Sequence, residues 1–165
     1  MNRKIVSLCL LAVLCLTFCT SAPAEEASEP FHFNGARWGM SQKQIRWLMG
    51  TPTQEPAGLG GYTALVYQTK LDELSCIIQY SFMPDGSLYL IEATSEDGEE
   101  FYNLLAEQFT EQFGKPLQGE GEEAEAAEEG GTLVWQPDGE TMIVLALNWS
   151  SDTCYAQMQR VTSGK

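Results

Sequence analysis

The side chains that most often carry acid–base, nucleophilic or metal chemistry are scarce in this sequence of 165 residues. His32 is the only histidine, so a zinc site built from histidines is excluded. A serine–histidine–aspartate triad would depend on this one residue, which lies at the start of the expected domain. Cys76 alternates with apolar residues along an expected strand, which is a poor setting for a reactive thiolate. The sequence therefore predicts a protein that is not an enzyme and that has no catalytic residue, cofactor or metal ligand set.

Carboxylates are the one reactive group present in quantity, with 23 aspartates and glutamates. Hydrolysis of a glycosidic bond needs two carboxyl groups opposed across a cleft, and adjacent pairs such as Glu99/Glu100 do not provide that arrangement. A secreted carboxylate-based hydrolase stays open as an alternative function, and it requires a cleft with two acids whose pKa values differ. Residues 118–130 hold six glutamates and no basic side chain. A second alternative is therefore a weak cation-binding module that uses this acidic loop.

The same acids dominate the charge of the chain. With 23 acidic and 9 basic side chains, the formal net charge is −14. Nucleic acid is excluded as a partner because phosphate binding needs clustered lysines and arginines. The charge also opposes docking on anionic lipid. The hydrophobic fraction of 44% is too high for a disordered acidic chain, so we expect a folded domain.

Residues 1–24 have the pattern of a secretory signal peptide. Two basic residues precede the apolar run 5–18, which is too short to span a bilayer comfortably. Ala22-Pro23-Ala24 then supplies small residues before a cleavage site after Ala24. We expect a secreted or extracytoplasmic protein, in the periplasm or at the cell surface, with no integral membrane span after processing.

The cysteines leave two questions open. A lipid anchor at Cys19 is an alternative to free secretion, although the large Phe18 stands where a lipobox has a small residue. Removal of residues 1–24 leaves Cys76 and Cys154 as the only two cysteines. In an exported protein, two cysteines indicate either one disulfide between them or two buried free thiols.

Two helices are marked by their capping residues. The first, 42–49, begins with a capping box at Ser41 and ends at Gly50. The second, 98–113, follows Asp97 as its expected N-cap. Runs of aromatic, β-branched and alternating apolar residues predict six strands. These strands are 62–69, 74–83, 87–94, 132–136, 141–149 and 154–161.

Both helices end in the same pattern, Gly50-Thr51-Pro52 and Gly114-Lys115-Pro116, and each is followed by three expected strands. This pattern predicts a tandem α-β-β-β repeat, and the alternative is two helices that merely end alike. We expect an α+β fold with one or two antiparallel sheets and two helices packed on one face. The expected organisation is a signal peptide 1–24, a flexible leader 25–30 and a single globular domain 31–165 of two repeats, 31–95 and 96–165, with the acidic loop 118–130.

The opening of the domain carries a resemblance. Its motif Phe33-Asn34-Gly35-Ala36-Arg37-Trp38-Gly39-Met40-Ser41, followed by a helix and Gly50-Thr51-Pro52, resembles small exported bacterial domains of uncharacterised function. More remotely, the chain resembles the SmpA/OmlA-type outer-membrane assembly lipoproteins and the tandem helix-plus-sheet β-lactamase inhibitor proteins. The motif covers residues 33–52 and implies a helix-capping geometry, and no inhibitory residue is carried over by it.

The expected strand 141–149 is apolar on both faces, which allows two interpretations. In the first, it is a central strand buried on both faces. In the second, one face of the sheet is open, and residues such as Trp135, Tyr155 and Tyr89 hold a partner there. Because no catalytic constellation is visible, we predict a non-catalytic exported domain that binds a protein or a cell-envelope component through its sheet face.

Overall fold

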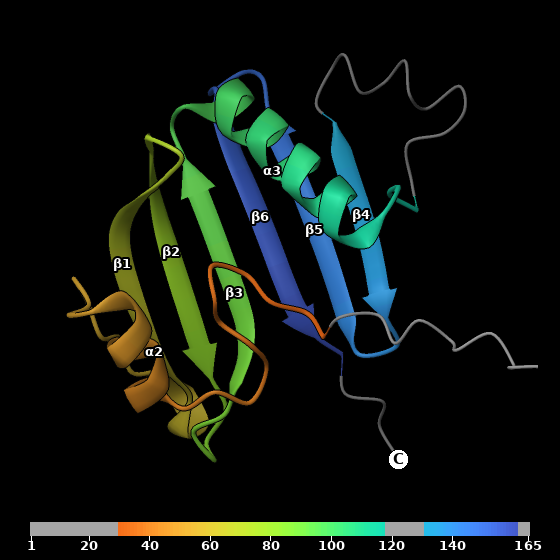
Figure 1. Cartoon of the computed structure of the whole chain (residues 1–165). Coiled ribbons are helices and arrows are strands. Elements are labelled where there is room, and N and C mark those ends of the chain that lie inside the picture. The colour runs from red at the N-terminus through yellow and green to blue at the C-terminus, as the bar shows by residue number, and fades with distance from the viewer. Residues whose placement is uncertain (1–29, 118–130, 162–165) are drawn as a thin grey trace, which may run out of the picture.

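The computed structural model of the chain describes residues 30–117 and 131–161 (Figure 1). The predicted signal peptide with Cys19 and the cleavage site at Ala24, most of the leader 25–30, and the acidic loop 118–130 lie outside the described residues. Within the described ranges, no helix is both long and apolar enough to cross a membrane.

A six-stranded antiparallel sheet forms the body of the structure, with the strand order β1-β2-β3-β6-β5-β4. The helices α2 and α3 lie on one side of this sheet, so the predicted α+β class is confirmed (Figure 1). Each expected strand is found, with ends that differ by no more than two residues from those predicted. The elements are α2 (Gln42–Met49), the short 3-10 helix η1 (Leu59–Gly61), β1 (Thr63–Leu71), β2 (Leu74–Phe82), β3 (Leu88–Ser95), α3 (Gly98–Phe113), β4 (Thr132–Asp138), β5 (Thr141–Asn148) and β6 (Thr153–Arg160).

Helix α2 has the bounds that its capping residues predict. The Gln44 amide donates to the Ser41 hydroxyl at 3.4 Å, and the Ser41 amide donates to Oε1 of Gln44 at 2.9 Å. Gly50 ends the helix with a φ of 85°, in the region that favours glycine. The buried side chain of Ile45 anchors the helix to the sheet. Local sequence alone therefore sets both ends of this element.

Asp97 occupies the N-cap position of helix α3 as expected, but the acceptors for the first amides of the helix belong to a residue distant in sequence. The Asp97 side chain makes no capping hydrogen bond. Instead, the Gly98 amide donates to the backbone oxygen of Asp152 at 3.1 Å, and the Glu99 amide donates to Oδ1 of Asp152 at 3.2 Å. The first amides of a helix need acceptors and favour a negative charge. The turn between β5 and β6 supplies both.

The two halves of the sheet meet at the pairing of β3 with β6. Six residue pairs join these strands, from Leu90 opposite Gln159 to Ser95 opposite Cys154. The three strands after each helix are neighbours in the sheet, and the two sets lie side by side rather than face to face. All six strands therefore share the same two faces, and helices on one side can cover only one of them.

The core lies between the sheet and the elements on the helix side. Phe101, Leu105 and Phe109 of α3 are buried there. Strand residues alternate between buried and more exposed positions, as a period of two requires. The buried residues of the two cysteine-bearing strands are Cys76, Ile78 and Tyr80 of β2 and Cys154, Ala156 and Met158 of β6.

The segment before α2 fills the space between the two helices (Figure 1). Phe31 stacks on Trp38 with ring centroids 4.5 Å apart, and Nε1 of Trp38 donates to Oγ1 of Thr141 at 2.8 Å. The Leu88 amide donates to the backbone oxygen of Met40 at 2.9 Å. The segment therefore binds to β3 in one half of the sheet and to β5 in the other.

Cys76 and Cys154 are free thiols, so the candidate disulfide between them is not formed. The reason is topological, because β3 runs between β2 and β6. Two strand spacings are about 10 Å, whereas a disulfide joins Cα atoms no more than about 7 Å apart. The structure instead has two buried thiols, and burial raises the pKa of Cys76 to about 11 and that of Cys154 to about 12.

Alkylation followed by intact mass spectrometry counts the free and accessible thiols. In native protein comprising residues 25–165, we expect neither thiol to react with iodoacetamide at mildly alkaline pH, because both are buried and protonated. In concentrated guanidinium chloride without reductant, both are expected to be alkylated. Unfolded, unreduced protein that carries no alkyl group would contradict the structure, because it would reveal a disulfide.

Substitution of Gly98 tests the distant cap of α3. A Cβ at this position would lie 2.5 Å from the carbonyl oxygen of Asp152, so we expect Gly98→Ala to lower the free energy of unfolding by about 1–3 kcal/mol. The matched control is Gly139→Ala, whose Cβ would meet nothing within 4 Å and whose expected effect is within about 0.5 kcal/mol. Urea unfolding measures both variants, and equal midpoints would contradict the close approach at Gly98.

Candidate functional site

The face of the sheet that points away from the helices is covered by no described element (Figure 1). Along β5, Ile143 and Leu145 are fully buried, whereas Met142 is 37% exposed and Val144 is half-buried. The interpretation of this strand as buried on both faces is therefore wrong. We call the uncovered surface the open face. It comprises Val66, Gln68 and Lys70 of β1, Ile77 and Gln79 of β2 with the buried Ser81, Leu90, Glu92 and Thr94 of β3, Tyr155, Gln157 and Gln159 of β6, Met142, Val144 and Ala146 of β5, and Thr132 and Val134 of β4.

A hydrogen-bonded network occupies the centre of the open face. Nε2 of Gln79 donates to Oε2 of Glu92 at 2.8 Å, and the Tyr155 hydroxyl donates to Oε1 of Glu92 at 2.8 Å. The same hydroxyl has Oε1 of Gln157 at 3.2 Å. Gln79 belongs to β2, whereas Tyr155 and Gln157 belong to β6. The hydrogen bonds therefore connect β3 with both of the strands beside it. The carboxylate of Glu92 is therefore held from both sides.

Tyr155 is the hydroxyl donor of this network over a wide range of pH. Its partial burial raises the pKa of the phenol, and the hydrogen bond to Glu92 and the negative charge of Glu92 raise the pKa further. A raised pKa keeps the proton on the phenol, so the hydroxyl can donate to the carboxylate. Of the three predicted partner-binding residues, Tyr155 is the one placed at the centre of the open face.

Trp135 lies on the other side of the sheet, so its predicted role in partner binding is wrong. The residue is 1% exposed, and its Nε1 donates to the backbone oxygen of Gly114 at 3.0 Å. Its ring meets Phe109 edge-on with centroids 5.5 Å apart. It pairs with Ile143 across β4 and β5, and cross-strand partners share a face. Trp135 therefore belongs to the core beneath α3.

Tyr89 lies at an irregularity in the sheet. The register of β2 and β3 shifts at Ser81 and Phe82, so Tyr89 has no partner in the ladder. Its ring approaches Tyr62 with centroids 5.8 Å apart, and partial burial raises the pKa of its phenol. Tyr89 is half-buried near the start of β3, and the negative charge of Glu92 also raises its pKa.

A groove adjoins the open face where β1, β2 and β3 approach their turns. Its volume is about 940 Å³. Gln68, Ile77 and Thr94 line it and form one cross-strand row, and Thr94 pairs in turn with Tyr155. Ile77 is 44% exposed in this groove. The groove therefore leads from the sheet corner to the edge of the central network.

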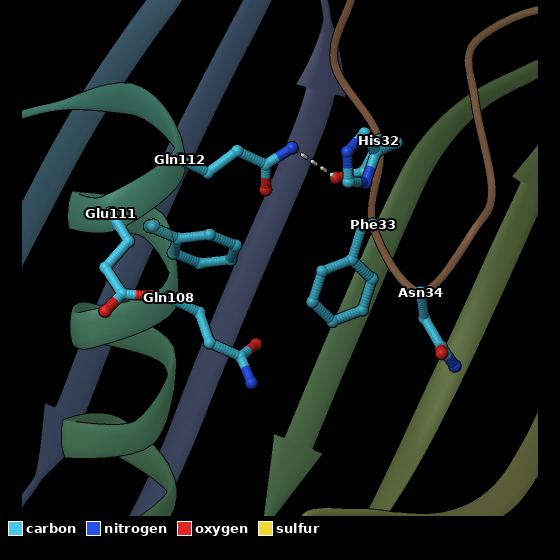
Figure 2. A pocket seen from close by; sticks show the side chains of 7 residues that line it. His32, Phe33, Asn34, Gln108, Glu111 and Gln112 are labelled. Carbon is cyan, nitrogen blue, oxygen red and sulfur yellow. Dashed lines mark hydrogen bonds between the residues drawn. The ribbon is translucent and has the colours of Figure 1, made fainter. Parts of the chain in front are cut away.

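A smaller hollow of about 380 Å³ lies between α3 and the segment before α2 (Figure 2). Gln108 and Gln112 extend from α3 toward Phe33 and Asn34 on the opposite wall. Nε2 of Gln112 donates to the backbone oxygen of His32 at 3.3 Å, which ties the two walls together. The lining residues include no serine, cysteine or aspartate that could work with His32 in nucleophilic catalysis.

Nothing in the part of the chain that the structure describes indicates catalysis. A carboxylate-based hydrolase needs two acids on opposite walls, whereas Glu96 and Asp97 of the groove come from one loop. Across the described ranges, no group of three or more histidines, cysteines, aspartates or glutamates is arranged to hold a metal ion. The acidic loop 118–130, on which the cation-binding alternative depends, lies outside the described residues.

Replacement of the Tyr155 hydroxyl tests the network. We expect Tyr155→Phe to lower the free energy of unfolding by about 0.5–1.5 kcal/mol at neutral pH, because Glu92 loses a donor. The pKa of Tyr155 is raised in the folded state, so the unfolded state releases this proton first as the pH rises. The difference between wild type and variant should therefore narrow above about pH 10.

The control is Tyr62→Phe, at a residue that is 43% exposed, with an expected change within about 0.5 kcal/mol at neutral pH. Urea titrations at several pH values measure both variants. A Tyr155→Phe difference that grows above about pH 10 would contradict the raised pKa.

Known proteins show little similarity to this chain. No protein-family model matches the chain, and no curated protein matches it. Among solved structures, the crystal structure of a DUF4309 family protein, YjgB, from Bacillus subtilis is similar, with a TM-score of 0.45 and 10% sequence identity over 73% of this chain and 78% of that chain. The resemblance to SmpA/OmlA-type lipoproteins and to β-lactamase inhibitor proteins is not shown by these comparisons and stays a prediction.

Proposed function

We propose that this chain is a non-catalytic exported domain that binds a protein or a cell-envelope component through the open face of its sheet. The observation that carries the proposal is a sheet face that no described element covers and that presents apolar side chains. Ile77 is 44% exposed and Met142 is 37% exposed on this face, and Val66, Leu90 and Val144 are half-buried beside them. Apolar side chains gathered on one surface favour association with a partner.

The polar centre of the open face supports selective binding. A partner that covers the face must leave Glu92 with hydrogen bonds or a counter-charge, since an unsatisfied buried carboxylate is costly. Gln79 and Tyr155 already supply two of these hydrogen bonds in the free protein. A partner without matching polar groups is therefore disfavoured.

The export of the domain is part of the proposal and rests on the signal-peptide pattern of residues 1–24. The expected destination is the periplasm, the cell surface or the medium, with a lipid anchor at Cys19 as the alternative to a free product. The formal net charge of −14 suits a soluble domain that is repelled by anionic surfaces.

We also propose that the two halves of the domain are a tandem repeat of one helix followed by three strands. The element order and the symmetric strand order β1-β2-β3-β6-β5-β4 support this proposal. The helices differ, since α2 has 8 residues and α3 has 16. Superposition of the two halves in an experimental structure tests the idea, and strands that fail to superpose would count against it.

Site-specific photo-crosslinking in the exporting cell tests the role of the open face. With benzoylphenylalanine in place of Met142, we expect a discrete crosslinked product, because this side chain is exposed on the open face. The matched control carries the same group in place of Trp47, which is 88% exposed on α2 at the helix side of the sheet. We expect no discrete product there.

A second substitution tests whether the crosslink at Met142 depends on the open face. Ile77→Arg places a charge on the open face and should reduce the Met142 crosslink at least several-fold, as central interface substitutions do. Absence of a product at Met142, or equal products at Met142 and Trp47, would contradict binding through the open face.

A further inference from the structure

Glu92 is a half-buried carboxylate at the centre of the open face. Within residues 30–117 and 131–161, no lysine or arginine forms an ion pair with it. The other charged side chain on the open face is Lys70, at the corner of β1, which forms an ion pair with Glu73 at 3.5 Å. Removing the charge of Glu92 from water is unfavourable unless an opposite charge accompanies it. Any partner that covers the face therefore meets this carboxylate.

The carboxylate is fixed in place before a partner arrives. Gln79 binds one of its oxygens and Tyr155 binds the other, both at 2.8 Å. An ionised carboxylate offers about four acceptor positions, so each oxygen keeps about one position for a further donor. A guanidinium group donates two parallel hydrogen bonds to the two oxygens of a carboxylate, and an ammonium group donates to either oxygen. The geometry of Glu92 therefore suits a cationic side chain.

The surroundings of Glu92 indicate what else the partner must offer. Leu90 lies on the same face of β3, and Val144 lies beyond Gln157 on β5. The groove lined by Ile77 and Thr94 begins next to Tyr155. The cross-strand neighbours of Glu92 are thus neutral, and Lys70, Glu96 and Asp97 line the groove at the corner of the sheet. A protein segment that places apolar side chains on either side of one basic side chain complements this arrangement.

A second copy of this chain is a poorer occupant. The chain carries 23 acidic and 9 basic side chains, so two copies repel each other. Symmetric pairing of two open faces would also bring two Glu92 carboxylates into one interface. We propose that the open face receives a basic protein segment and that Glu92 pairs with its arginine or lysine side chain. This inference rests on the proposed function, because it names the class of partner for the same face.

The test uses purified protein labelled with nitrogen-15 and two pentapeptides. One is acetyl-Val-Thr-Arg-Thr-Val-amide, in which the valines and the arginine share one face of an extended peptide, and the other has citrulline, an uncharged analogue of similar shape, in place of arginine. We expect the arginine peptide to shift the amide resonances of Glu92 and Tyr155 and to bind about tenfold more tightly than the citrulline peptide. Added salt should reduce this difference.

Two variants assign the effect to one carboxylate. Glu92→Gln keeps the side-chain shape and removes the charge, so we expect it to weaken binding of the arginine peptide about tenfold and to leave the citrulline peptide unchanged. The control Glu107→Gln removes an exposed charge on α3, at the helix side of the sheet, and should change neither affinity. A native circular dichroism spectrum and a single cooperative melting transition verify that Glu92→Gln is folded.

Four outcomes would overturn the inference. They are absence of arginine-peptide binding at the open face, equal affinities of the two peptides, shifts that map to Glu96 and Asp97 instead of Glu92, and open-face shifts that depend on protein concentration alone, which would indicate a second copy. A crosslink at Met142 together with an inert Glu92→Gln variant would leave the proposed function standing. A peptide effect without a crosslink at Met142 would count against the proposed function in the cell.

Discussion

The pairing of β3 with β6 is the interaction on which the rest of the structure depends. Six residue pairs along these strands join the two three-stranded halves into one sheet. Had the halves packed face to face, the inner face of each would be buried, and neither would be open to a partner. Because they pair edge to edge, one face receives both helices and the other holds Glu92 and Tyr155, which come from the two central strands. Side-by-side pairing thus produces the candidate site.

The helix side is closed by elements of unequal size. The longer helix α3 lies against β4, β5 and β6, whereas α2 is half as long and is supplemented by the segment before it. The hydrogen bond from Trp38 to Thr141 and the capping of α3 by Asp152 link parts of the chain that are far apart in sequence. These links fix the elements on the helix side to the sheet.

Local chemistry made much of the fold predictable. The capping box at Ser41 and the glycine at position 50 mark both ends of α2, because they satisfy backbone groups of that helix directly. Aromatic, β-branched and alternating apolar residues predicted the six strands, and the structure places Cys76 and Cys154 on the covered face. What the sequence left wrong or open has a common cause. The role of Trp135 and the pairing of the two cysteines both depend on which strands are neighbours and which face is covered, and no local pattern encodes that.

The sequence by itself determined the elements of this protein, its α+β class, its acidity and the scarcity of catalytic side chains, because these properties depend on residue type and short-range spacing. Only the tertiary structure decided that β3 separates the two cysteines, that Trp135 is buried under α3 and that Glu92 lies between Gln79 and Tyr155. The physical reason is that strand order is set by burial and hydrogen bonding between segments distant in the chain. Glu92 and Tyr155 are 63 residues apart, and the pairing of β3 with β6 brings them into contact.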